Sequence, residues 1–77
     1  MSDEIRKIAI LGGTGDLGGG LARQWSRAGY EILIGSRTLE KGQQAAADLL
    51  AEFSDLNVTG LDNATAAEQA DLVVLTV

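Results

Sequence analysis

The residues best placed to do chemistry are glycines in the run Ile8–Gly18, where an apolar segment stops and a helical pattern begins. The glycines fit two spacings, Gly13-x-Gly15-x-x-Gly18 and Gly12-x-x-Gly15-x-x-Gly18, and the sequence leaves both registers open. Either spacing lets a diphosphate approach the backbone while a following helix directs its free amides and positive dipole end toward it. Because a strand pattern precedes the glycines and a helix pattern follows them, they predict a dinucleotide site rather than a plain turn.

Two polar residues of this segment have different interpretations. Thr14 can donate its hydroxyl to a phosphate or ribose oxygen, or it can form a hydrogen bond within the turn. Asp16 is interpreted as a helix-start residue, because a carboxylate beside a diphosphate would repel it. The candidate binding residues of the segment are Gly12, Gly13, Thr14, Gly15, Leu17 and Gly18.

A second candidate group, Gly35-Ser36-Arg37, follows the next apolar run. An NAD site usually carries an acidic residue at this place, to accept hydrogen bonds from the ribose 2′-hydroxyl. A guanidinium instead pairs with a 2′-phosphate through two hydrogen bonds, and the Ser36 hydroxyl can add a third. Lys41 lies one turn further on, where it is either a second phosphate contact or a solvated surface lysine. The group predicts NADP as the ligand.

These residues must be positioned by alternating strands and helices, the pattern of a parallel sheet covered by helices. The apolar runs predict strands over residues 5–11, 30–35, 57–60 and 71–77, and helices over 16–28, 38–53 and 63–70. Right-handed crossovers then place the first two helices on one face and the third on the other. The prediction is one α/β domain over residues 1–77, with a Rossmann-type, doubly wound parallel sheet of strand order 3-2-1-4.

The helices are expected to bury one face each. Gly42 is expected to weaken the second helix by about 1 kcal/mol relative to Ala. Either Asp62 or Asn63 is expected to cap the third helix. Trp25, Tyr30 and Phe53, the aromatic residues, are expected in or near the core. The predicted inward faces are Leu17, Leu21, Trp25 and Ala28 in the first helix, and Leu39, Ala46, Leu49 or Leu50, and Phe53 in the second.

The last apolar segment, Leu72–Val77, lacks the alternation of a half-exposed strand, so we expect it to be buried on both faces. A terminal strand of this kind would present an unpaired apolar edge to water, which soluble proteins generally avoid. The expectation is therefore that the chain is the N-terminal part of a longer protein, truncated after its fourth strand, or that a second copy covers the edge.

Composition narrows the classes of function. The 77 residues carry a net charge of −5 and contain no Cys and no His, which argues against a disulfide, an imidazole or thiolate nucleophile, and a metal site. The acidic balance argues against nucleic-acid binding, and no apolar run approaches the roughly 20 residues of a membrane span. The mixed charges of Met1–Lys7 are unlike a secretory signal, so a cytoplasmic location is expected. The sequence contains neither paired carboxylates nor a Tyr-x-x-x-Lys pattern, so it predicts no catalytic residues.

Taken together, the motifs resemble one family. The segment Gly12–Gly18, the group Gly35–Arg37 with Glu40-Lys41, and the pattern from Asn63 to Val77 are similar to the N-terminal domain of NADPH-dependent coenzyme F420 oxidoreductases. The resemblance implies hydride transfer between the reduced deazaflavin coenzyme and NADP, in which the cofactors carry the chemistry.

The resemblance also assigns roles. It implies that Thr14, Ser36, Arg37 and Lys41 hold the 2′-phosphate and its ribose, while Thr76 and Val77 approach the nicotinamide. It further implies a C-terminal domain that helps to form the deazaflavin pocket and a dimer. The alternative is a non-catalytic NADP-sensing module, or another NADP-binding module like the short-chain reductases, whose longer glycine spacing the chain shares.

Overall fold

A computed structural model describes residues 5–12 and 16–76 of the chain. Strands and helices alternate in the predicted order, and every predicted boundary lies within two residues of the observed one. The elements are β1 (Lys7–Leu11), α1 (Asp16–Arg27), β2 (Glu31–Ser36), α2 (Leu39–Glu52), β3 (Val58–Asp62), α3 (Asn63–Gln69) and β4 (Leu72–Leu75).

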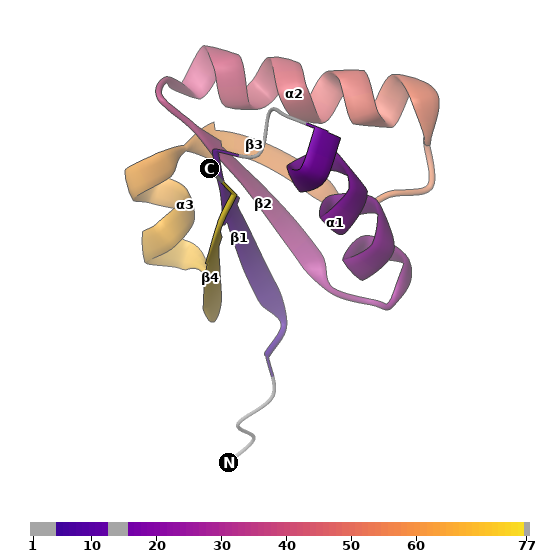
Figure 1. Cartoon of the computed structure of the whole chain (residues 1–77), viewed down its shortest axis with the longest axis horizontal. Coiled ribbons are helices and arrows are strands. Elements are labelled where there is room, and N and C mark those ends of the chain that lie inside the picture. The colour runs from indigo at the N-terminus through magenta and orange to yellow at the C-terminus, as the bar shows by residue number, and fades with distance from the viewer. Residues whose placement is uncertain (1–4, 13–15, 77) are drawn as a thin grey trace.

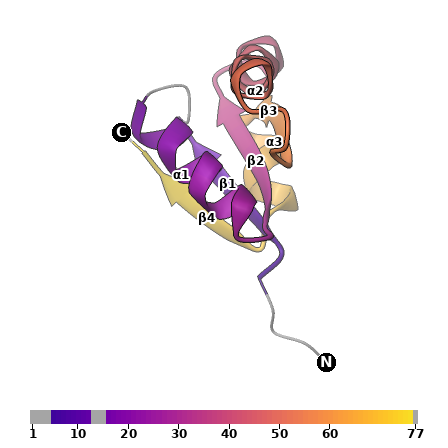
Figure 2. The same cartoon turned by 90° about the vertical axis from the view of Figure 1, so that its right-hand side faces the viewer.

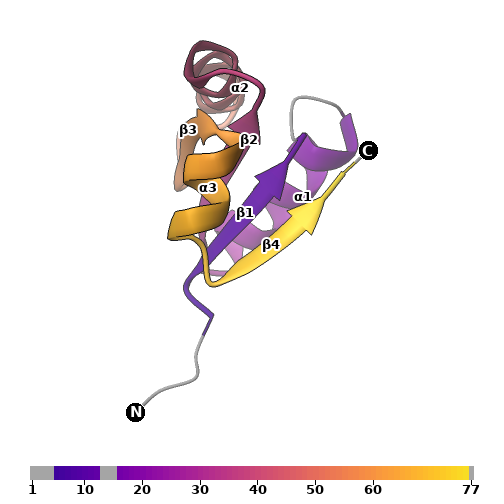
Figure 3. The same cartoon turned by 90° about the vertical axis from the view of Figure 1, so that its left-hand side faces the viewer.

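The four strands form one parallel sheet of order β3-β2-β1-β4, which confirms the predicted topology (Figure 1). Helices α1 and α2 cover one face of this sheet, and α3 covers the other (Figures 2 and 3). The protein therefore has the α/β Rossmann-type architecture. No helix in the described ranges is both long and apolar enough to cross a bilayer.

The two central strands are buried on both faces, as expected for a parallel sheet covered by helices. On the face of α1 and α2, isoleucines of β1 and β2 pack against Ala22 and Ala46. On the face of α3, Ala9 and Leu33 pack against Ala66. The predicted aromatic positions are confirmed, because Trp25, Tyr30 and Phe53 all pack against the larger core.

The predicted inward face of α1 is wrong at its two ends. Leu17 is 66% exposed, whereas Gly18 and Ala22 are buried. Leu17 lies about 100° around the helix from Gly18, so it cannot face the sheet with it. Ala28 lies beyond the end of α1 and is exposed. In α2, Leu39 is also exposed, because it lies at the helix start, before the first buried position at Gly42.

Local signals begin and end the helices. Thr38 caps α2, and its hydroxyl accepts a hydrogen bond from the Lys41 amide at 3.1 Å. Asp62, rather than Asn63, caps α3 and accepts from the amide of Thr65 at 2.8 Å. This hydrogen bond, followed by one from the Thr65 hydroxyl, lowers the pKa of Asp62. Gly29, with φ of 108°, makes the left-handed turn that ends the α1 region.

Helix α2 approaches β3 closely through two glycines. A Cβ on Gly42 would collide with the backbone of Leu61, and a Cβ on Gly60 would collide with the carbonyl of Gly42. The glycine that weakens α2 intrinsically is therefore required by the packing of the helix on the sheet.

The side chain of Phe53, at the end of α2, lies under two cations of α1. The guanidinium carbons of Arg23 and Arg27 are 4.9 and 5.1 Å from the centre of its ring. Arg27 Nε also lies 3.4 Å from Asp55 Oδ2. These contacts connect α1 to the segment that leads from α2 into β3.

Strand β4 is the edge strand beside β1 (Figure 3). The expectation that it is buried on both faces is wrong within this chain, because Leu72, Val73 and Leu75 are 40%, 42% and 69% exposed. Only Val74 packs against the core. The reason is geometric, since the described residues place no strand beyond β4 and no helix contacts it extensively.

The start of β4 is fixed to β1 by Asp71. One carboxylate oxygen of Asp71 accepts the amides of Arg6 and Lys7, each at 2.9 Å. The hydrogen bond from Lys7, and then that from Arg6, lowers the pKa of the Asp71 carboxyl. The ionised form of Asp71 therefore contributes to the pairing of these strands.

Candidate dinucleotide-binding site

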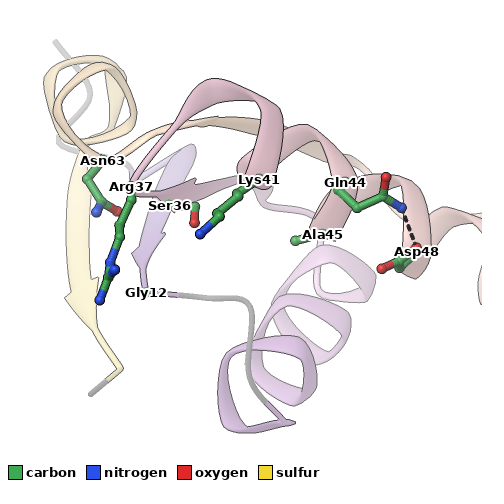
Figure 4. Close-up of a pocket in the computed structure, with 8 residues that line it drawn as sticks. All are labelled: Gly12, Ser36, Arg37, Lys41, Gln44, Ala45, Asp48 and Asn63. Carbon is green, nitrogen blue, oxygen red and sulfur yellow. Dashed lines mark hydrogen bonds between the residues drawn. The ribbon is translucent and has the colours of Figure 1, made fainter.

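A cleft of about 610 Å³ opens where β1, β2 and β3 end (Figure 4). The structure brings together four of the predicted site residues there, from three separate segments of the chain. The described residues that line the cleft are Gly12, Ser36, Arg37, Lys41, Gln44, Ala45, Asp48 and Asn63.

Strand β2 positions the two central residues of the cleft. Ser36 is the last residue of β2 and is only 7% exposed, because β1 and β3 flank the strand. Arg37 follows it and is exposed. The guanidinium of Arg37 makes no hydrogen bond or ion pair with any residue in the described part of the chain. A donor-only side chain thus stands beside the Ser36 hydroxyl at the mouth of the cleft.

Lys41 adds a second cation from the first turn of α2. Its backbone amide donates to the Thr38 hydroxyl that caps α2, and its ammonium has no partner among residues 5–12 and 16–76. In Figure 4, Ser36 lies between the side chains of Arg37 and Lys41. Two cations at the positive end of a helix dipole are unfavourable unless an anion lies between them. This set of donors fits a phosphate ester.

Gly12 lines the cleft directly after the end of β1. Its φ is +73°, and its amide donates to the carbonyl oxygen of Gly35 at 3.0 Å. A Cβ at this position would lie 3.0 Å from the carbonyl oxygen of Thr76. Both backbone conformation and space therefore require glycine here. Three predicted loop residues, Gly13, Thr14 and Gly15, lie outside the described residues, as does Val77.

Three other predicted residues do not line this cleft. Leu17 is exposed on α1, and Gly18 is buried in the same helix. The hydroxyl of Thr76 donates to the carbonyl oxygen of Leu11 at 3.1 Å, and its amide donates to the same oxygen at 3.0 Å. Thr76 therefore stands next to Gly12 at the end of β4, with its side chain turned toward the β1 backbone.

Three residues of α2 line the cleft although the sequence did not predict them as site residues: Gln44, Ala45 and Asp48. They follow Lys41 at helical spacing, which places them on one face of α2. Gln44 Nε2 donates a hydrogen bond to Asp48 Oδ1 at 2.8 Å. The Asp48 carboxylate is therefore held by a side chain of the same helix.

Asn63 was also missed as a site residue. Ser36 pairs with Asp62 at the end of the parallel β2–β3 ladder, so the residues that directly follow the two strands, Arg37 and Asn63, are neighbours. The prediction ended the third strand at residue 60 and so hid this pairing. The signal is the continuation of β3 through Leu61 and Asp62.

Strand order, the glycine at the β1–α1 turn and the polar group at the end of β2 place the chain in the class of Rossmann-type nucleotide-binding domains. Residues 7–77 match the family described as "NADP oxidoreductase coenzyme F420-dependent". The chain belongs to this family.

Two of three relatives carry names that agree with this assignment, and the third is named as a dehydrogenase. The chain is 55% identical over 73 residues to the F420-dependent NADP reductase of Methanothermobacter marburgensis, covering 92% of this chain and 33% of that protein. It is 44% identical over 73 residues to the F420-dependent NADP reductase of Methanocaldococcus jannaschii, covering 90% and 32%. It is also 33% identical over 70 residues to a probable arogenate/prephenate dehydrogenase of the latter organism, covering 91% and 14%. The chain thus spans about a third of the length of the reductases that it matches.

Proposed function

We propose that this chain is the NADP(H)-binding domain of an oxidoreductase that transfers a hydride between reduced coenzyme F420 and NADP. The observation that carries the proposal is the group Ser36, Arg37 and Lys41, gathered in one cleft, with Ser36-Arg37 at the end of β2, where an NAD site usually carries an acidic residue for the ribose 2′-hydroxyl. Family membership and the names of the reductase relatives support the two cofactors.

In this proposal, the cations select the 2′-phosphate. Arg37 pairs with it through two N–H groups, Lys41 adds an ammonium, and Ser36 donates its hydroxyl. These contacts neutralise an anion beside the first turn of α2, where the helix dipole also favours negative charge. Discrimination between NADP and NAD follows from the charge of this one phosphate.

The glycine segment serves the diphosphate. Gly12 keeps side-chain atoms away from the ends of β1 and β4, and the start of α1 supplies amides and the positive end of a dipole. Gly13, Gly15, Leu17 and Gly18 belong to the proposed diphosphate segment. Thr14 belongs to the proposed contacts with the 2′-phosphate and its ribose, and Thr76 and Val77 to the proposed nicotinamide side.

The nicotinamide, when bound, supplies or accepts the hydride. The residues of this chain bind and orient the dinucleotide. The proposal includes a further domain or a second copy that covers β4 and completes the pocket for the second substrate, and it includes a cytoplasmic location.

A second candidate is the NADP-binding domain of a dehydrogenase with another substrate. The similarity to a probable arogenate/prephenate dehydrogenase over 91% of the chain favours this alternative. The lower identity, 33% against 55%, makes it the weaker of the two.

Two measurements test the proposal. Calorimetric titration of this chain with NADPH and NADH should give clearly tighter binding of NADPH, and equal affinities would remove the role of Arg37. The full-length gene product should then transfer hydride between NADPH and F420, followed by the absorbance of both cofactors. NADPH binding with no transfer to F420 would favour a dehydrogenase of another substrate or a non-catalytic NADP-sensing module.

A further inference from the structure

Asn63 carries an unusual atom for a residue that lines the cleft. Its Oδ1 is buried and has no hydrogen-bond partner, and it is the one such side-chain atom within residues 5–12 and 16–76. A buried acceptor without a donor is destabilising and therefore needs an explanation.

The surroundings of this atom are built to hold it. A Cβ on Gly35 would lie 2.8 Å from Asn63 Oδ1 and 2.7 Å from a methyl group of Leu11. The missing side chain of Gly35 therefore makes the space that the carboxamide occupies. The backbone of Asn63 is fixed as well, because Asp62 caps α3 through two hydrogen bonds with Thr65.

The neighbour with complementary chemistry is Arg37. The pairing of Ser36 with Asp62 places Arg37 and Asn63 side by side at the ends of β2 and β3, and both line the same end of the cleft (Figure 4). Arg37 has five N–H donors and no acceptor, and it has no partner among the described residues. A phosphate that binds one edge of the guanidinium uses two of these donors and leaves others free.

We propose that Asn63 is a positioning residue for 2′-phosphate recognition. In the NADP complex, its Oδ1 accepts a hydrogen bond from one edge of the Arg37 guanidinium and so holds the opposite edge of the guanidinium toward the phosphate. The inference rests on the proposed function and adds a residue that touches no part of the phosphate. It gives the orphaned acceptor a donor and fixes a guanidinium that makes no hydrogen bond or ion pair with the described residues.

The test compares Asn63→Ala with the parent chain by titration with NADP and NAD. We expect the affinity for NADP to fall about tenfold, the usual effect of losing one hydrogen bond to a charged group, while the affinity for NAD changes less than twofold. The matched control is Gln69→Ala, which removes an exposed amide from the same helix outside the cleft. This control should leave both affinities unchanged.

A double-mutant cycle separates positioning from direct contact. In an Arg37→Gln background, Asn63→Ala should reduce the affinity for NADP less than twofold further, because the acceptor then has no guanidinium to hold. The melting temperature of Asn63→Ala without ligand should not fall, because Oδ1 makes no hydrogen bond in the free chain.

The remaining outcomes overturn the inference in different ways. Equal losses for NADP and NAD would mean that Asn63 contacts the base or ribose instead. Additive losses in the cycle would mean that Asn63 and Arg37 act independently. A parent chain that does not prefer NADP would overturn the proposed function itself, and the inference with it.

Discussion

The two edges of the sheet differ in how completely the residues of this chain cover them. On the side of β2, β3 and α2, the backbones approach so closely that Gly42 and Gly60 leave no room for a Cβ. On the side of β4 and α1, Leu72, Val73 and Leu75 stay exposed, and a Cβ on Gly20 would meet no atom within 4 Å. The proposed 2′-phosphate group lies on the tight side. The side near the proposed nicotinamide position is the one with apolar surface still open.

The sharpest test of this difference is a pair of glycine substitutions. Gly42→Ala should destabilise the chain by about 3 kcal/mol, because its Cβ would overlap the Leu61 backbone. Gly20→Ala, in the open part of α1, should stabilise it by up to about 1 kcal/mol through helix propensity. Urea denaturation measures both. Equal free energies of unfolding for the two variants would contradict the difference in packing.

The second prediction concerns binding on the tight side. Arg37→Gln should weaken NADP binding by about 1–3 kcal/mol, since hydrogen bonds between charged groups are lost, and should leave NAD binding nearly unchanged. Gln43→Glu is the control, because it makes the same change in charge at an exposed position of α2 outside the cleft. Calorimetric titration gives both values. An equal loss in the control would assign the effect to net charge alone.

The third prediction addresses the open side. Leu75→Lys should change the free energy of unfolding by no more than about 0.5 kcal/mol, because the side chain is 69% exposed. It should also reduce concentration-dependent association in sedimentation experiments, since a lysine protects an edge strand. Thr59→Lys adds the same charge to β3, the opposite edge strand, at an exposed position. If both lysines reduce association equally, the apolar edge of β4 is not its cause.

The smallest expected effect is the pH dependence of the β1–β4 connection. The pKa of Asp71 is lowered in the folded chain, so its carboxylate stabilises the fold above the unfolded pKa near 3.8, and this contribution is lost as the pH falls through the lowered value. Asp71→Asn should therefore melt below the parent chain at neutral pH, with a difference that shrinks under acid conditions. Glu68→Gln, an exposed change on α3, is the control. A pH-independent difference for Asp71→Asn would argue against a role for its charge.

Topology could be predicted from sequence because it depends on features that repeat over many residues. Apolar runs separated by helical patterns predicted the strand order and the face of the sheet that each helix covers, without any knowledge of contacts. Ser36 and Arg37 could be placed together in the site for the same reason, since the end of a parallel strand points to the binding edge.

The missed features depend on single distances between distant segments. From the sequence, Gly42 was expected only to weaken α2. The β3 backbone at Leu61, which requires a glycine at this position, becomes its neighbour only in the folded chain. Leu17 was predicted to face the sheet because apolar spacing alone does not resolve a shift of one residue around a helix. Asn63 was considered as a cap, and its place beside Arg37 follows from the exact register of β2 and β3.

That register sets where the chain can tolerate a change in length. An insertion in the connection between Phe53 and Val58 would leave the pairing of Ser36 with Asp62 intact. One extra residue inside β3 would instead bring Asp62 to the place beside Arg37, where a carboxylate would neutralise the guanidinium. Among natural or engineered length variants of this domain, preference for a phosphorylated ribose should therefore survive changes before Val58 and be lost with changes between Val58 and Asp62.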